Sequence, residues 1–383
     1  MKTYQLSLFA LLLFFGPQLI AQDVDVLIIE EEEEEEEASF QLSGYVDAYF
    51  QNVFTDNTDD EPGSDLGFPT SFTPETNGFS VGNVNLLAEK SLGKVGFVGQ
   101  IGFGPRANDA NLGGDQDRAG YYIPNLQQLF VTYSPSDALT FTFGQFGTFV
   151  GYEVIDAPAN MNYSTSYMFS YGPFFHTGLK ADFAITEGFG AMLGVFNNTD
   201  SRFNDPGYYY GAQLSAEAGG LAAYLNFLYG TDEKDIINDE DATTFQIDLT
   251  ATFEASESLM FGINATNKST QNFVNEGTVG DSDGFTGVAL YSTIGITDGF
   301  DLSLRGEYFQ EAVPESISLD GRSVTALTAT GNITVGDLRI IPEFRLDSGS
   351  DFATTYSGGI IDFGGTDEDD SVASFILAAI YSF

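Results

Sequence analysis

Apolar and polar residues alternate one by one along most of the chain after residue 39. The clearest run is 245–254, FQIDLTATFE, in which every odd residue is apolar and every even residue is polar. The alternation recurs at 300–308, 139–144 and 40–51. Successive side chains of a β-strand point to opposite faces, so each run predicts a strand with one apolar and one polar face. The sequence therefore predicts an all-β fold.

Sixteen such segments can be placed, and the connections between them alternate between short and long. A soluble β-sandwich would show the same alternation within each strand. The even strand count, the short turns and the long loops instead favour a single transmembrane antiparallel β-barrel of about 16 strands (14–18), with short periplasmic turns and long extracellular loops. The predicted strands are 40–54, 78–90, 94–104, 125–134, 138–146, 174–185, 188–198, 207–218, 220–231, 242–254, 257–270, 284–296, 299–311, 322–335, 337–347 and 371–383.

The membrane environment requires this sheet to close on itself. Lipid offers no hydrogen-bond partners, so strand 371–383 should pair with strand 40–54 and leave no open edge. The apolar faces would point outward to outer-membrane lipid. The last strand ends on alternating aromatic residues, Tyr381 and Phe383, a pattern typical of the C-terminal signal of outer-membrane barrels, and we expect the barrel-assembly machinery to bind there. Tyrosines expected in the interfacial girdles are Tyr208, Tyr210, Tyr229, Tyr291, Tyr308 and Tyr381.

The first 38 residues predict export followed by a tether. Residues 1–21 carry Lys2 and an apolar stretch over 6–20, as in a signal peptide, and this stretch is short for a helical membrane anchor. Residues 22–38 include the glutamate run 30–37, which predicts a disordered acidic periplasmic tether; divalent-cation binding is the alternative. Residues 39–383 would form the barrel in the cell outer membrane.

Charge and composition exclude several classes of function. Lys and Arg total 13 against 56 Asp and Glu, a net charge of −43, which is the opposite of a nucleic-acid-binding surface. The absence of Cys excludes disulfides and thiolate metal sites. Acidic stretches at 56–61, 281–284 and 367–370 lack EF-hand spacing. We predict no cofactor and no specific metal site, with cations only loosely associated with the acidic loops.

The polar faces of the predicted strands carry charges that should line the lumen. Sixteen strands leave a water-filled interior, and an excess of acidic wall residues favours cations. Arg305, Arg339 and Arg345 would either form a basic patch on one wall or pair with Glu307 and Glu343 as structural salt bridges. The predicted pore-lining residues are Asp47, Asp182, Glu217, Asp248, Glu254, Asp301, Glu307, Glu343, Lys180, Arg305, Arg339, Arg345 and His176.

The connection 147–173 differs from the other long loops because it is rich in aromatic residues and carries little charge. Tyrosines exposed on an external loop would be poorly solvated, so the loop is expected to fold inward as a constriction; an aromatic cap on the barrel rim is the alternative. In the inward geometry Glu153 and Asp156 would face the pore opposite the basic wall. The aromatic residues expected to be buried are Tyr163, Tyr167 and Tyr171.

Several stretches carry a family resemblance. They are LSGYVDAY at 42–49, GYE at 151–153, NYS at 162–164, FSYGP at 169–173 and HTG at 176–178. Together they resemble the β-barrel porin-2 (OmpL-like) family of outer-membrane proteins. The resemblance covers most of the chain after the tether and implies a porin-like barrel, without assigning a solute. The glutamate run and the extreme acidity do not belong to this pattern.

The expected function is a porin for passive diffusion of small hydrophilic solutes and ions, mildly preferring cations; a homo-oligomer of such barrels is compatible with this prediction. A non-conducting structural or adhesive barrel is the alternative. A hydrolase would need His176 together with a nucleophile such as Ser164, Ser166 or Ser170, but no Gly-x-Ser-x-Gly elbow is present. We therefore predict that the protein is not an enzyme.

Overall fold

A computed structural model describes the chain over 40–54, 70–73, 75, 77–112, 125–203, 207–231, 242–271, 273–275, 278–280, 283–312, 323–350 and 371–383. The predicted signal peptide, the predicted tether and the acidic stretches at 56–61 and 367–370 lie outside these residues, as do residues 281 and 282. All of the inner-wall residues predicted above lie within them.

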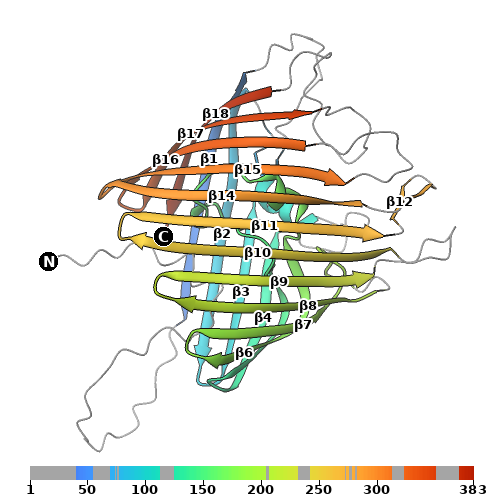
Figure 1. The fold of residues 1–383 in the computed structure, drawn as a ribbon. Helices are drawn as coiled ribbons and strands as arrows, with labels where there is room; N and C mark the ends of the chain where they lie inside the picture. The colour runs from blue at the N-terminus through green and yellow to red at the C-terminus, as the bar shows by residue number, and fades with distance from the viewer. Residues whose placement is uncertain are drawn as a thin grey trace, which may run out of the picture.

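The described strands form one closed antiparallel barrel of sixteen strands (Figure 1), as the sequence predicts. Around the barrel each strand pairs with its neighbours in the sequence, with two exceptions: β11 pairs with β14 across the separate β12–β13 hairpin, and β1 pairs with β18 to close the barrel. The strands are β1 (Gln41–Phe54), β2 (Gly78–Leu92), β3 (Val95–Phe103), β4 (Leu126–Ser136), β5 (Leu139–Gly147), β6 (Phe175–Thr186), β7 (Phe189–Phe196), β8 (Tyr209–Ala218), β9 (Leu221–Thr231), β10 (Thr243–Ser256), β11 (Leu259–Gln271), β12 (Phe273–Asn275), β13 (Thr278–Gly280), β14 (Asp283–Thr297), β15 (Phe300–Ala312), β16 (Ser323–Val335), β17 (Leu338–Ser350) and β18 (Ser371–Ser382).

The seam between the first and last strands closes as predicted. β1 and β18 pair in antiparallel register, with Val46 opposite Tyr381. Gly44 and Phe383 exchange both backbone hydrogen bonds, at 3.0 and 2.9 Å between N and O. At this end of the barrel two residues separate the paired strands of each hairpin, such as Gly219 and Gly220 between β8 and β9. The connection 148–174, which the structure describes in full, lies at the opposite end, between β5 and β6.

The barrel is apolar outside and polar inside, the reverse of a soluble protein. On β10, Phe245 and Phe253 are 44% and 45% exposed, whereas Gln246 and Asp248 are buried at 2% and 1%. This follows the odd–even alternation of the sequence. Among the described residues no helix has the length and apolar content needed to cross a bilayer.

One tyrosine departs from the predicted girdle. Tyr208, Tyr210, Tyr229, Tyr308 and Tyr381 are about half exposed on the outer face. Tyr291 was expected among them, but it is buried inside the barrel and stacks on Tyr152 with ring centroids 4.3 Å apart. The expectation was wrong because 284–296 carries apolar residues on both faces, so its pattern does not identify the inner one.

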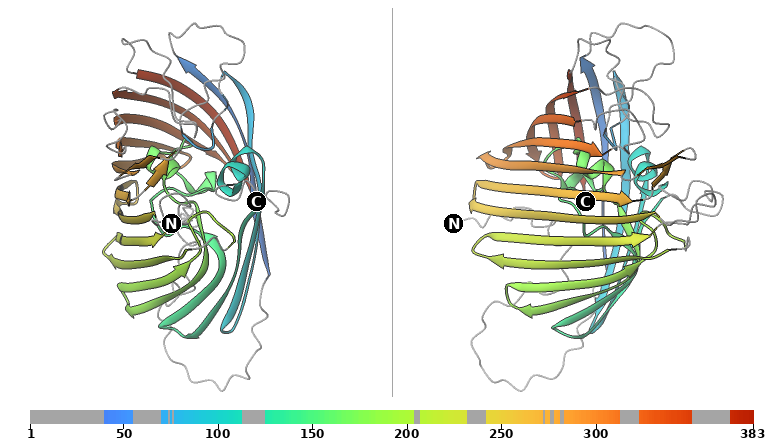
Figure 2. Two further views of the ribbon diagram at one scale, coloured as in Figure 1. Left: turned by 90° about the vertical axis from the view of Figure 1, so that its right-hand side faces the viewer. Right: turned by 45° about the vertical axis from the view of Figure 1, so that its right-hand side comes forward.

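At the end opposite the short turns, described parts of three connections enter the barrel. They are residues 70–73, the helix α2 (Pro105–Leu112), and residues 148–174 with the 3₁₀ turn η2 (Ala157–Ala159) and the helix α3 (Tyr167–Tyr171). Figure 2 shows α2 and the green 148–174 segment within the ring of strands. Phe72, Ala110, Ile155 and Phe169 form one buried apolar cluster that joins the three segments. The inward α2 was not predicted, because 105–124 has only the composition of a polar loop.

Candidate functional site: the barrel interior and its inner loop

The segment 148–174, called the inner loop below, is held where it leaves and rejoins the wall. Asp200 accepts backbone N–H groups from Phe174 and Phe175 at 2.7 and 2.9 Å. Burial raises the pKa of Asp200 to about 6. His176 is fully buried, its Nε2 lies 3.0 Å from Thr148 Oγ1, and its ring packs on Phe149 with centroids 5.0 Å apart. His176 therefore supports the base of the loop.

Two wall glutamates hold the loop backbone. Glu343 on β17 accepts the N–H groups of Tyr163 and Ser164 at 2.7 and 3.0 Å. Glu307 on β15 accepts those of Tyr167 and Met168 at 3.0 and 2.9 Å. Both carboxylates are buried, Glu343 at 0% and Glu307 at 3% exposure. Each carboxylate thus satisfies two consecutive backbone donors that would otherwise be buried and unpaired.

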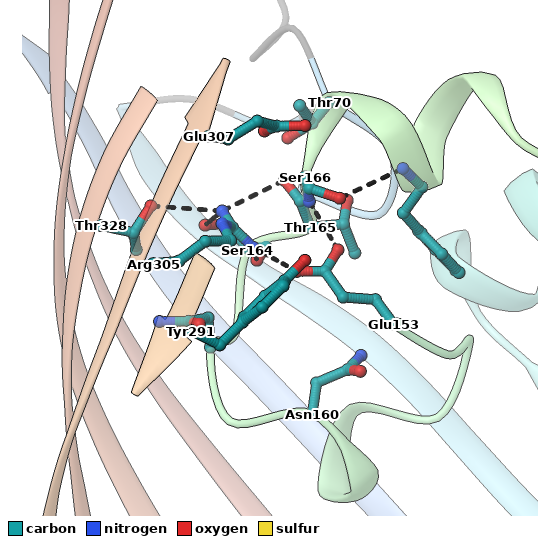
Figure 3. A network of polar contacts seen from close by, with 12 residues as sticks. Thr70, Glu153, Asn160, Ser164, Thr165, Ser166, Tyr291, Arg305, Glu307 and Thr328 are labelled. Atoms are coloured by element: carbon teal, nitrogen blue, oxygen red, sulfur yellow. Dashed lines mark hydrogen bonds and ion pairs between the residues drawn. The ribbon is translucent and has the colours of Figure 1, made fainter. Parts of the chain in front are cut away.

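Two arginines from the same strands hold the loop carbonyls. Arg305 donates to the carbonyl oxygens of Ser164 and Thr165 at 2.6 and 3.3 Å, and Arg345 donates to that of Thr165 at 2.8 Å. Arg305 also forms a 2.6 Å ion pair with Glu153. Figure 3 shows Arg305 reaching from the wall to Glu153 and to the loop around Ser164. Arg345 pairs with Asp347 at 2.8 Å.

These contacts correct both interpretations of the basic wall. Arg305 and Arg345 do not form an open basic patch, because both are buried beneath the loop. Their ion pairs are with Glu153 and Asp347, whereas Glu307 and Glu343 receive backbone N–H groups. The alternation of the strands indicates which residues face inward, but it contains no information about what the loop brings to meet them.

The two loop acids were expected to face the pore together, and the structure separates them. Glu153 contacts the basic wall directly and is buried at 6%. Asp156 lies against the wall of β1–β4, where its carboxylate accepts from Tyr45, Asn85, Gln100 and Gln127 at 2.8–3.3 Å. These four donors are neutral. The loop therefore contacts opposite walls of the barrel through these two carboxylates.

Asp47 on β1 fixes a second point of the loop. Its Oδ2 accepts the hydroxyl of Tyr163 at 2.6 Å and lies 4.0 Å from Nε of Arg106 on α2. The Arg106 guanidinium lies over the rings of Phe72 and Tyr163, at 4.9 and 5.2 Å from their centroids. Burial, with the charge of Asp47, raises the pKa of Tyr163 well above its usual value, so the hydroxyl remains a donor.

The aromatic residues of the loop are mostly buried against the wall. Tyr163 and Tyr167 are both 1% exposed, and the Tyr167 hydroxyl donates to Asp347 at 2.8 Å. Tyr171 is half-buried against Phe285 and Phe309. These rings pack against residues of the inner wall.

The remaining predicted wall residues fall into two groups. Asp248 is buried and accepts from Gly151 N at 3.0 Å as well as from Asn226 and Asn264, so it also holds the loop. A second group lies toward the end with short turns. There Lys180 and Asp182 form a 3.1 Å ion pair whose side chains are 21% and 39% exposed. The other members of this partly exposed inner group are Glu217, Glu254, Asp301 and Arg339. Arg339 also donates to the Ala157 carbonyl of the loop at 2.9 Å.

Some residues of the interior were not predicted. Asp347 shares the odd inner register of Glu343 and Arg345, so the alternation of 337–347 contains enough information to find it. Arg106 and Arg202 lie in connections, where no period indicates direction. Arg202 donates to the carbonyls of Asn111 and Leu126 at 2.6 and 3.0 Å and so ties α2 to β4.

The serines near His176 have other partners. Ser166 caps α3 through Phe169 N at 3.1 Å, and Ser164 Oγ accepts from Arg305 at 3.3 Å. Across the described ranges, no three His, Cys, Asp or Glu side chains gather in a group able to hold a metal ion.

A closed sixteen-strand barrel with an apolar exterior, a polar interior and an inward loop defines the porin class of outer-membrane β-barrel. The model of the family described as beta-barrel porin-2, OmpL-like matches residues 39–383. The chain belongs to this family, as the resemblance in its sequence indicated. Among curated proteins, no sequence matches the chain.

Solved structures share the fold at low sequence identity. The outer membrane channel DcaP of Acinetobacter baumannii is 14% identical with a TM-score of 0.62, over 90% of this chain and 97% of that one. OmpT, an outer membrane protein of Vibrio cholerae, is 12% identical with a TM-score of 0.56, over 90% and 98%. A porin refined at 1.8 Å is 10% identical with a TM-score of 0.51, over 90% and 100%.

Proposed function

We propose that the protein forms a water-filled channel for passive diffusion of small hydrophilic solutes and ions, narrowed by the inner loop and mildly preferring cations. The observation that carries this proposal is the exposed ion pair on the inner wall. Lys180 and Asp182 alternate with outward Leu179 and Phe183, yet their side chains are 21% and 39% exposed. Inward charges with this exposure require water in the lumen.

The proposed cation preference rests on the inner wall toward the short turns. Five acids of this region face inward, Glu89, Asp182, Glu217, Glu254 and Asp301, against two bases, Lys180 and Arg339. The difference is three negative charges, because 5 − 2 = 3. The acids deeper in the barrel contribute less to this preference, because Glu307, Glu343 and Asp248 are buried in contacts with the loop. Negative charge at a mouth raises the local concentration of cations.

A permeability assay tests the proposal. Vesicles containing the purified, folded barrel are placed in isotonic solutions of neutral sugars of increasing size. Swelling should be fast for the smallest sugar and should fall steeply with size, because the loop narrows the passage. Swelling no faster than that of empty vesicles, for every solute, would reject the channel.

A non-conducting structural or adhesive barrel is the second candidate. The observation that favours it is the inward packing of three segments, 70–73, α2 and the inner loop, around buried Phe72 and Phe169. If these segments close the lumen, the vesicles remain impermeable although the barrel is folded. The same assay therefore separates the two candidates.

A further inference from the structure

Four wall residues hold residues 163–168 of the inner loop mainly through the backbone. Glu307 and Arg305 come from β15, and Glu343 and Arg345 come from β17. We call these four residues the backbone clamp. The carboxylates accept the N–H groups of residues 163, 164, 167 and 168, and the guanidinium groups donate to the carbonyls of residues 164 and 165.

Most contacts of the clamp are with peptide groups of the loop; the side-chain contacts of Arg305 are with Glu153 and Ser164 Oγ. Glu343 binds the backbone at Tyr163–Ser164, and Glu307 binds it four residues later, at Tyr167–Met168. Between the two strands, Thr330 on β16 donates to Glu343 at 2.7 Å, and Thr328 accepts from Arg305 at 3.2 Å. These two wall contacts help to orient Glu343 and Arg305. In a β-sheet these N–H and C=O groups would bond to a neighbouring strand; here the charged side chains bond to them instead.

We propose that the backbone clamp sets the position of the inner loop and therefore the width of the passage, so that Glu307 and Glu343 act as positioning residues and not as ion-attracting charges. This inference rests on the proposed channel function only for the measurements of conductance and reversal potential. Both carboxylates are buried and hydrogen-bonded to the loop, whereas Glu254, an inner-wall acid near the short turns, is exposed. The buried acids Glu307 and Glu343 and the exposed acid Glu254 thus have different roles.

The chain permits a clean test because it contains no Cys. Ser164→Cys is nearly isosteric and places a thiol at a position that is 1% exposed while the loop is held. The rate at which a small charged methanethiosulfonate modifies this thiol reports release of the loop. The matched variants in this background are Glu343→Gln and Glu254→Gln, because each removes one negative charge from the inner wall.

Glu343→Gln should accelerate modification roughly tenfold or more. Each oxygen of the Glu343 carboxylate accepts one backbone N–H, and in glutamine one of these oxygens becomes an NH₂ group, which cannot accept. Glu343→Gln should also broaden the distribution of single-channel conductance. Glu254→Gln should leave the thiol rate unchanged and lower the reversal potential in a salt gradient. An unchanged thiol rate in folded Glu343→Gln, or a fall in its reversal potential alone, would overturn the inference.

A second variant covers the case in which Glu343→Gln does not fold. Glu343→Asp keeps the charge but shortens the side chain by one methylene, so it too should release the loop and accelerate modification. The wild-type rate in folded Glu343→Asp would overturn the inference. The thiol rate is measured without current, so a barrel that fails to conduct would reject the channel while leaving the clamp result intact.

Discussion

Glu153 of the inner loop and Arg305 of β15 form a buried ion pair with 2.6 Å between Oε1 and Nη1. The pair joins residues 152 positions apart in the chain, and neither side chain is more than 5% exposed. Removing one partner of a buried pair leaves an uncompensated charge, which costs about 3–5 kcal/mol. The inner loop is therefore an integral part of the folded barrel.

A double-mutant cycle tests this coupling. Glu153→Ala and Arg305→Ala should each destabilise the barrel, and their coupling free energy should be about 1–3 kcal/mol, as for other residues in direct contact. Unfolding by urea from lipid vesicles measures the free energies. The Lys180–Asp182 pair is the control, because partly exposed pairs are typically worth less than about 1 kcal/mol. Equal coupling in the two pairs would contradict this account.

The seam between β1 and β18 should depend on Gly44. A Cβ at this position would lie 2.3 Å from the Asn85 carbonyl oxygen and 2.9 Å from Cζ of Phe383. Gly44→Ala should therefore slow closure of the barrel and lower the yield of folded protein in lipid vesicles, measured by electrophoretic mobility without heating.

Gly99 provides the matched control for Gly44. It lies on β3, and a Cβ there would meet nothing within 4 Å. Gly99→Ala should fold like the wild type, because a strand favours alanine at least as much as glycine. A similar loss of folded protein in both variants would show that the Gly44–Phe383 contact has no special role.

The acidic residues of the inner wall should differ in how strongly their neutralisation changes the cation preference. Glu217→Gln with Glu254→Gln should lower the cation preference, because both side chains are partly or fully exposed toward the short turns. Asp248→Asn should mainly disturb the loop, since Asp248 accepts from Gly151, Asn226 and Asn264. Reversal potentials in a KCl gradient measure the preference. A larger fall for Asp248→Asn than for the double variant would contradict this assignment.

Asp200 should make stability depend on pH. Its pKa in the folded protein is about 6, above the ordinary value of 3.8, because of burial. The folded protein therefore binds this proton more tightly than the unfolded chain does. Its contribution to the free energy of unfolding should rise by about 1–3 kcal/mol as the pH falls from about 7 to about 4.

Asp200→Asn removes this titration while keeping an oxygen that accepts from Phe174 and Phe175. The stability of the wild type minus that of the variant, measured by urea unfolding at several pH values, should therefore increase toward low pH. A difference that is flat, or that decreases toward low pH, would contradict the assignment.

The strands, their pairing order and the seam follow from the sequence, because side chains of a strand alternate between two faces and lipid favours apolar residues on the outer face of most strands. The position of the inner loop does not follow in this way, since it depends on contacts between distant residues. A signal was present nonetheless: strands 284–296 and 371–383 carry apolar residues on both faces. The structure explains them, because Met168 of the loop packs with Ala289, and Tyr163 packs with Ile376 and Ile380.

For the charged residues, too, the sequence predicts the direction of a side chain but not its partner. Their inward direction could be predicted for Glu343 and Arg345 from the alternation, but their partners could not, because the loop backbone has no sequence signature. Arg106 was missed since helix α2 occupies a connection without any period. In a barrel of this kind, inner apolar residues on a wall strand indicate where an inward loop packs.

Single-channel recording from the purified, folded protein in a planar bilayer tests the central claim most directly. We predict discrete, uniform conductance steps in KCl, with a reversal potential in a salt gradient of the sign expected for cation preference. Absence of steps from protein that is shown to be folded and inserted would contradict the account and would favour the structural or adhesive barrel.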